Sequence, residues 1–181
     1  MKLPDIGDQH DPDPEVRRAA ARYAGPDSGA LHPARRDRRP IDPPESAWNA
    51  HDAIQISERR AAQIVSIYTA KPGGLFKAME VAAVCRAAGI VCNVNGSVET
   101  GIGNLANIHL AAAAPAVELS CVVPVSTPEN WLNGQIGGIY YRDDLISRPM
   151  TLADGAIEVP DGPGMGIEAD ESKIERYRVR N

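Results

Sequence analysis

Blocks of apolar residues separated by polar ones follow residue 45, and the spacing inside each block predicts its secondary structure. The segment SAWNAHDAIQISERRAA, residues 46–62, predicts a helix that begins near Ser46 or Asn49 because both residues are favourable helix caps. The run QIVSIYTA, residues 63–70, is short and apolar, as is typical of a buried strand.

The same alternation continues toward the carboxyl end of the chain. KAMEVAAVCRAA has apolar residues at helical spacing, and Gly89 follows it where a helix-ending glycine belongs. IVCNVN, residues 90–95, predicts a second strand. NLANIHLAAAA predicts a helix that stops at Pro115, and VELSCVVPV, residues 117–125, is a further apolar run rich in strand formers. Strands alternating with helices predict an α/β fold with a parallel sheet, and the continuous apolar strands predict that both faces of the sheet are covered.

The first 44 residues differ sharply from the rest. They hold eight of the fifteen prolines but only five residues of the Ile, Leu and Val class. Such a segment can bury little apolar surface, so conformational entropy favours an irregular or disordered chain. The predicted division is therefore an irregular segment, residues 1–44, followed by one folded unit, residues 45–181.

Charge and cysteine content exclude several classes of protein. The net charge is −5 and aromatic residues make up 4% of the chain, which argues against binding to nucleic acid. No apolar stretch is long enough to span a membrane, and the amino terminus lacks the pattern of a signal peptide. Three cysteines without C-x-x-C spacing indicate free thiols rather than disulfides or zinc ligands. These features predict a cytoplasmic protein without nucleic-acid or membrane partners.

Functional groups of parallel α/β units collect at the carboxyl ends of the strands, here residues 68–74, 93–103 and 123–127. Lys71 there can pair with a carboxylate. Glu99 can act as a base, accept a hydrogen bond, or simply begin a helix. For the Gly73-Gly74 pair, anion binding and tight turning are equal alternatives. His109 lies among apolar helical neighbours, where a packing role is more common than a ligand role.

Four linked motifs resemble the carboxyl-terminal half of the mandelate racemase and muconate lactonizing enzymes, which belong to the enolase superfamily. The motifs are PPESAWN at 43–49, KPGG at 71–74, GSVETGIG at 96–103 and EVPDGPGMGIEADESKIERY at 158–177. The resemblance covers roughly residues 41–178. It implies a partial (β/α)8 barrel of TIM type, about units five to eight, in a chain that contains about half of such an enzyme.

The resemblance also implies a reaction. Family members abstract a proton α to a carboxylate, and Mg²⁺ stabilises the resulting enediolate, because developing charge must meet preorganised positive charge. Two of the three metal carboxylates fall outside this chain. The third position reads P-P-E-S here, so Pro44 replaces the expected aspartate and Glu45 is the one candidate ligand.

The resemblance assigns the catalytic candidates to Tyr68, Lys71 and Glu99. Many relatives carry a lysine where this chain has Tyr68. A tyrosine is a poor base at neutral pH but can donate a proton, which favours a one-base dehydratase over a two-base racemase. The expected substrate is a small carboxylate, with a hydroxylated cyclic amino acid such as 3-hydroxyproline as one candidate, and racemisation or cycloisomerisation stays open.

The substrate-binding candidates on the same edge are Gly73, Gly74, Asn95 and Ser97. Two further alternatives remain at this point. The chain can be a silent half-barrel that serves as an oligomeric or interaction module, or an intact small enzyme of unrelated mechanism. As an enzyme part, it requires the missing barrel half or another copy of itself, since open barrel edges favour association.

Overall fold

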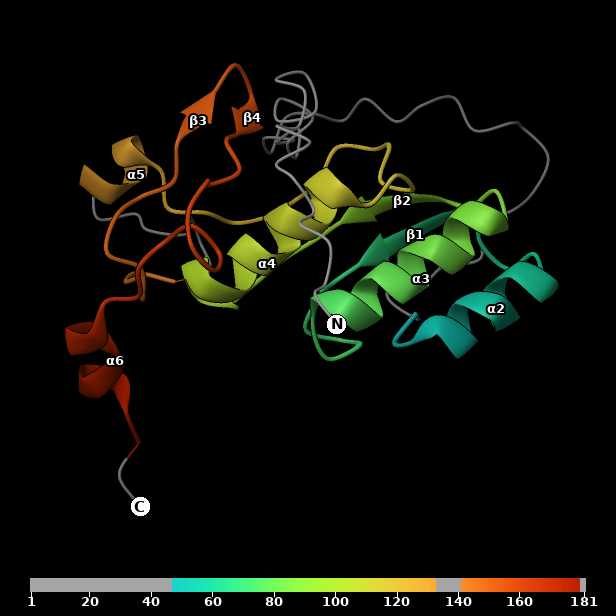
Figure 1. The fold of residues 1–181 in the computed structure, drawn as a ribbon, viewed down its shortest axis with the longest axis horizontal. Helices are drawn as coiled ribbons and strands as arrows, with labels where there is room; N and C mark the ends of the chain where they lie inside the picture. The colour runs from blue at the N-terminus through green and yellow to red at the C-terminus, as the bar shows by residue number, and fades with distance from the viewer. Residues whose placement is uncertain (1–46, 133–140, 180–181) are drawn as a thin grey trace, which may run out of the picture.

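The computed structural model describes residues 47–132 and 141–179. The segment 1–44, expected to be irregular, lies outside the described residues, as does Glu45. Figure 1 shows the arrangement of the elements, with the helices α3 and α4 beside the strands β1 and β2.

The first helix among the described residues is α2, Ala50–Glu58, where a helix was expected. Asn49 caps it, because its side-chain oxygen accepts a hydrogen bond of 3.0 Å from the Asp52 amide. The strand β1, Ile64–Ile67, follows. It leads through a turn into α3, Leu75–Ala87, which starts two residues before the predicted segment. Gly89 lies just beyond this helix with a φ of 69°, as its predicted role as a helix-ending residue requires.

The strand β2, Val91–Val94, pairs with β1 in parallel, with Ile64 opposite Val91. The predicted parallel βαβ unit is confirmed. The helix α4, Thr100–Ala113, follows and ends before Pro115 as predicted, but it begins four residues earlier than expected. The α/β class is therefore correct for this part of the chain.

Two details of the predicted sheet are wrong. Burial alternates along β2, where Cys92 and Val94 are buried while Val91 and Asn93 are partly exposed, so β2 is not covered on both faces. The run 117–125 forms no named strand. It joins the sheet edge through parallel bridges from Cys92 to Val117 and from Asn95 to Val122. Longer pairing is interrupted because the amides of Glu118 and Leu119 both donate to the Cys92 carbonyl, which shifts the register between the two bridges.

The chain after α4 has shorter elements. They are α5, Pro128–Leu132; β3, Leu152–Ala153; β4, Ala156–Ile157; and α6, Glu171–Tyr177. The strands β3 and β4 form an antiparallel hairpin whose turn residues, Asp154 and Gly155, both have positive φ. Asp-Gly is a preferred pair for such a turn, so the hairpin has a local signal in the sequence.

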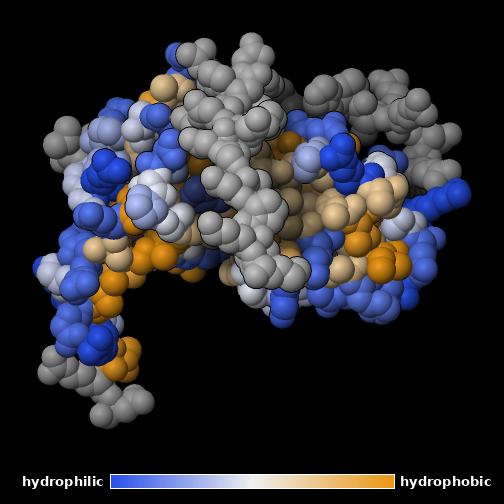
Figure 2. All heavy atoms as spheres, viewed as in Figure 1, coloured by the Kyte–Doolittle hydropathy of each residue, from blue (hydrophilic) through white to orange (hydrophobic). Residues whose placement is uncertain are grey.

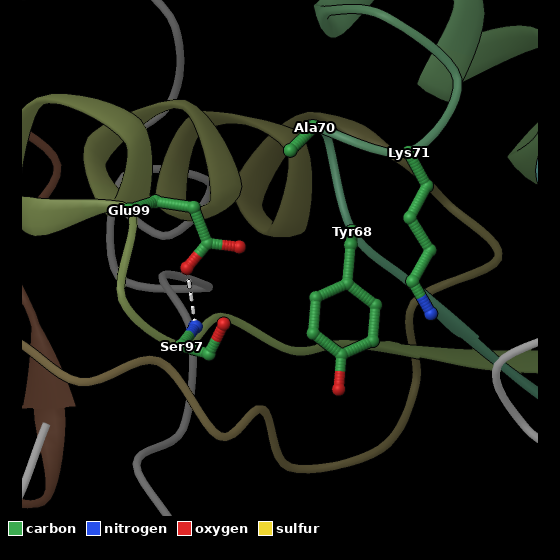
Figure 3. Close-up of a pocket in the computed structure, with 5 residues that line it drawn as sticks. All are labelled: Tyr68, Ala70, Lys71, Ser97 and Glu99. Carbon is green, nitrogen blue, oxygen red and sulfur yellow. Dashed lines mark hydrogen bonds between the residues drawn. The ribbon is translucent and has the colours of Figure 1, made fainter.

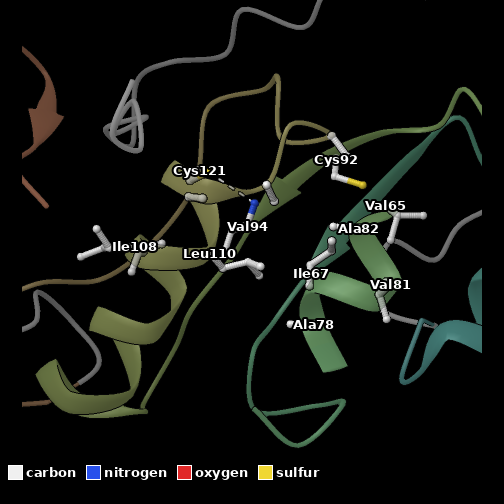
Figure 4. Close-up of a cluster of buried hydrophobic side chains, with 14 of the residues drawn as sticks. Val65, Ile67, Ala78, Val81, Ala82, Cys92, Val94, Ile108, Leu110 and Cys121 are labelled. Atoms are coloured by element: carbon white, nitrogen blue, oxygen red, sulfur yellow. Dashed lines mark hydrogen bonds between the residues drawn. The ribbon is translucent and has the colours of Figure 1, made fainter. Parts of the chain in front are cut away.

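The core lies between the strands and the helices α3 and α4 (Figure 4). The largest fully buried side chains include Ile67 from β1, Val81 from α3 and Ile108 from α4. Some large apolar side chains stay exposed, among them Phe76 and Val98. The space-filling view shows orange hydrophobic patches between hydrophilic areas (Figure 2).

Candidate functional site

An open depression of about 240 Å³ lies at the carboxyl ends of β1 and β2. Its lining residues are Tyr68, Ala70, Lys71, Ser97 and Glu99. Figure 3 shows the Tyr68 ring between Lys71 and Glu99, with Ser97 below the glutamate. The three catalytic candidates and one substrate-binding candidate, Ser97, therefore share one site, although their roles remain predictions.

The turn after β1 holds Tyr68 and Lys71 in place. The Thr69 amide and hydroxyl both donate hydrogen bonds to Oδ1 of Asn107 on α4, at 2.9 and 2.8 Å. The Gly74 amide donates to the Thr69 carbonyl at 2.8 Å. A buried side chain of α4 thus holds the end of β1 against that helix.

Gly73 and Gly74 form the sharp part of this turn, with φ values of 92° and 116°. Only glycine adopts such angles without strain, so tight turning accounts for both residues. Neither residue lines the depression. Their expected role in substrate binding is a prediction without support from their position.

The Lys71 ammonium lies over two aromatic rings. It is 4.2 Å from the centre of the Tyr68 ring and 5.6 Å from that of Trp48. A cation over an aromatic face is attracted by the ring quadrupole, so these contacts favour one position of the lysine side chain. Trp48 precedes α2, and only the fold brings it to the turn after β1, so its place in the sequence does not mark it as a site residue.

Glu99 precedes the first residue of α4, as the helix-start alternative predicted. Its carboxylate does not bond the amides of the helix but turns back to accept a hydrogen bond from the Ser97 amide. This contact directs the carboxylate toward the depression (Figure 3). Glu99 therefore both precedes the helix and lines the depression.

Asn95 lies at the end of β2 but does not line the depression. Its amide donates to the Ile67 carbonyl at 3.0 Å, and its Oδ1 accepts a weak bond of 3.4 Å from Asn93. Asn93 in turn accepts a bond of 2.6 Å from the Ser66 hydroxyl. These polar side chains connect neighbouring strands, which is a structural role.

A complete magnesium site is not present in residues 47–132 and 141–179. They contain no group of three or more His, Cys, Asp or Glu side chains that could hold a metal ion. Mg²⁺ prefers octahedral coordination by oxygen ligands, which the carboxylate of Glu99 alone does not provide. The described residues therefore do not fit the metal that the resemblance implies, and the expected ligand Glu45 lies outside them.

Other candidates have structural explanations. His109 shares a hydrogen bond of 3.1 Å with the Met165 carbonyl, in agreement with a packing role. All three cysteines are free and buried, as predicted. The hydrogen bond with Cys85, together with burial, raises the pKa of Cys92, and burial raises the pKa of Cys121. Cys92 and Cys121 are therefore poor nucleophiles at neutral pH.

The described helices include none long and apolar enough to cross a membrane. Two βα turns with polar and charged side chains at the carboxyl edge of parallel strands define the class of the protein: an α/β domain with a candidate site at the strand ends. A family model described as "Enolase C-terminal domain-like" matches residues 24–173. The chain belongs to this family, and the predicted kinship with the mandelate racemase and muconate lactonizing enzymes is confirmed.

Named relatives agree with this assignment. The chain is 33% identical over 138 residues to muconate cycloisomerase 1 of Rhodococcus opacus, covering 76% of this chain and 34% of that one. It is 35% identical over 136 residues to N-succinylamino acid racemase of Amycolatopsis sp., covering 74% and 33%. The crystal structure of muconate lactonizing enzyme from Klebsiella pneumoniae superimposes with a TM-score of 0.61 and 28% identity, covering 75% of this chain and 35% of that one.

The chain thus spans about a third of the length of these relatives. Their names describe isomerases, namely cycloisomerases and a racemase, which supports an enolase-superfamily isomerase. They do not support the expected dehydratase reaction or a hydroxyproline substrate. The family match begins at residue 24, inside the segment expected to be irregular.

Proposed function

We propose that this chain contributes part of the active site of an enolase-superfamily isomerase that acts on a small carboxylate, by cycloisomerisation or racemisation. One observation carries the proposal: Lys71 and Glu99, from consecutive strand ends, line one depression together with the Tyr68 ring. Opposite charges and a phenol around one open space provide groups that can bind a carboxylate and exchange protons.

Each side chain has a distinct role in this proposal. The Lys71 ammonium, held by the Tyr68 ring at 4.2 Å, attracts the substrate carboxylate and donates a proton to its α-carbon, and the neutral amine that results accepts the proton in the reverse direction. Glu99, held by the Ser97 amide, accepts a hydrogen bond from the substrate or serves as the opposing base. The Tyr68 hydroxyl is a proton donor. No step is assigned to magnesium, because the described residues do not form its site.

In this proposal, the chain belongs to an incomplete barrel that contains about units five to eight. The described sheet consists of β1 and β2, and isolated bridges join the run 117–125 to its edge. The matched part of the chain covers about a third of the length of the relatives. The rest of the site, including any further metal ligands, then comes from barrel units that the described residues do not include, in the missing barrel half or in another copy of this chain.

A chimera tests the proposal directly. The matching third of the Rhodococcus opacus muconate cycloisomerase is replaced by residues 41–178 of this chain, and conversion of muconate is followed by ultraviolet absorbance. We expect turnover that Lys71→Met reduces by about 100-fold or more, as is usual for loss of a catalytic acid or base. Lys77→Met is the matched control, because Lys77 is exposed on α3 and does not line the depression.

Two results would contradict the proposal. A folded chimera without turnover would favour the silent interaction module. An active chimera unaffected by Lys71→Met would show that the assigned residues are wrong. A chiral carboxylate substrate incubated in heavy water separates the two proposed reactions, since a two-base racemase returns the inverted substrate carrying deuterium, whereas muconate has no stereocentre and reports cycloisomerisation alone.

A further inference from the structure

Asp144 is a buried carboxylate that the proposed reaction does not use. Its side chain is fully buried, yet it lies after α5 in a region with few regular elements. Oδ1 accepts hydrogen bonds from the amides of Gly101, at 2.6 Å, and Leu145, at 2.8 Å. Oδ2 accepts one from the Ser126 hydroxyl at 2.5 Å. Asp144 thereby joins three segments that are far apart in the sequence.

The Gly101 contact lies two residues beyond Glu99. Between them, Thr100 has a φ of 58°, which is unfavourable for a β-branched residue. A side chain at Gly101 has no room, since its Cβ would lie 2.8 Å from each Asp144 carboxylate oxygen. The backbone thus adopts a strained conformation at one residue and makes an unusually close approach to Asp144 at the next.

Such strain persists only where surrounding contacts stabilise it, and it is concentrated at functional sites. Here the Asp144 carboxylate supplies that contact, because a charge-assisted hydrogen bond to an amide is stronger than a neutral one. Asp144 is itself fixed from the other side, where the Lys173 ammonium of α6 donates to its backbone carbonyl at 2.9 Å.

We propose that Asp144 is a positioning residue for Glu99: by holding the Gly101 amide, it stabilises the left-handed Thr100 turn that directs the Glu99 carboxylate to the Ser97 amide and the depression. The catalytic importance of this position rests on the function proposed above. The claim that Asp144 positions the Glu99 carboxylate does not depend on that function, so the two claims are tested separately.

The geometric test uses the whole chain in its present form, labelled with ¹⁵N, and follows the Ser97 amide by NMR. A hydrogen bond to a carboxylate moves an amide proton downfield, and Glu99→Gln identifies the signal that depends on this bond. We expect Asp144→Ala to displace the Ser97 signal as Glu99→Gln does. Asp144→Asn keeps an oxygen for the Gly101 amide, so it should preserve most of the signal.

A second pair of variants isolates the turn. Thr100→Gly removes the side chain that makes a positive φ unfavourable, so it should restore the Ser97 signal in the Asp144→Ala background. Asp143→Asn is the matched control, because it removes the neighbouring charge but keeps an oxygen for the Asp144 amide, which donates to Oδ1 of Asp143 at 2.9 Å. It should leave the Ser97 signal in place.

An unchanged Ser97 signal in folded Asp144→Ala overturns the proposal. If that variant does not fold, Asp144→Ser decides in its place, since serine keeps a buried polar group but is too short to reach both Gly101 and Ser126. Displacement of the signal in Asp144→Ser supports the proposal, and an unchanged signal overturns it.

The catalytic test uses the chimera. Misplacing a catalytic group should lower kcat by roughly 10- to 100-fold with KM changed less than about twofold. A purely structural role would lower the melting temperature but leave the kcat of the folded enzyme unchanged, and would overturn the proposal. If the chimera has no turnover, the proposed function fails, while the Ser97 signal still decides whether Asp144 positions Glu99.

Discussion

Two regions of this chain are stabilised in different ways. Residues 47–114 contain helices of 9, 13 and 14 residues and two paired strands of four residues each. Residues 141–179 contain two-residue strands and a helix of seven residues. In the first region apolar side chains at regular spacing form the core, whereas in the second region aspartate side chains form many of the contacts between segments. Periodicity therefore predicts the first region and not the second.

The neighbouring residues Asp143 and Asp144 make this difference measurable. Asp144→Ala leaves the Ser126 hydroxyl and the Gly101 amide buried without their partner, so we expect the free energy of unfolding to fall by about 3–5 kcal/mol. Asp143 forms ion pairs near the surface, and Asp143→Ala should cost about 0–1 kcal/mol. Urea denaturation followed by circular dichroism measures both. Equal losses would show that burial of Asp144 is not what stabilises the second region.

The regular region should respond to loss of apolar volume instead. Ile108 is fully buried on α4, and Ile108→Ala should lower the free energy of unfolding by about 3 kcal/mol, through lost burial and the cavity that remains. Ile102 lies on the same helix but is 40% exposed, so Ile102→Ala should cost less than about 1 kcal/mol. The same denaturation experiment compares them, and similar losses would mean that α4 does not pack on the sheet as described.

One polar contact of the regular region should have an intermediate effect. Asn107→Ala removes the acceptor for the Thr69 amide and hydroxyl, and we expect a loss of about 2 kcal/mol. Asn49→Ala, which removes an exposed helix cap, should cost about 1 kcal/mol. Hydrogen exchange provides a local measurement, because the Thr69 amide should exchange faster in Asn107→Ala but not in Asn49→Ala.

The smallest expected effect is a dependence of stability on pH. Partial burial alone would raise the pKa of Asp143, but hydrogen bonds from Lys173 and Tyr177 hold it below its ordinary value of 3.8. A carboxyl group whose pKa is lower in the folded state stabilises the fold above pH 3.8, and this contribution is lost as the pH falls through the folded-state pKa. Asp143→Asn should therefore flatten the acid limb of a plot of melting temperature against pH. An unchanged slope would contradict this role of Asp143.

The candidate site contains residues that the sequence predicted and residues that only the structure revealed. The strand-end positions and the family resemblance together predicted Tyr68, Lys71, Ser97 and Glu99, and the parallel pairing of β1 with β2 brings them to one depression. Trp48 and Asp144 were not predicted. Neither residue belongs to a periodic pattern. Trp48 contacts Lys71 from the segment before α2, and Asp144 contacts Gly101 from a segment distant in sequence.

The sequence by itself determined the α/β class, the order of the helices and strands up to Pro115, the helix-ending role of Gly89 and the family resemblance. These features depend on local preferences, on apolar periodicity and on short motifs, all of which are readable along one segment of chain. Only the tertiary structure decided that β2 is covered on one face, that the run 117–125 pairs through bridges, and that Asp144 holds the turn after Glu99. Such contacts join residues up to 43 positions apart, and their energies depend on burial and hydrogen-bond geometry that no local pattern records.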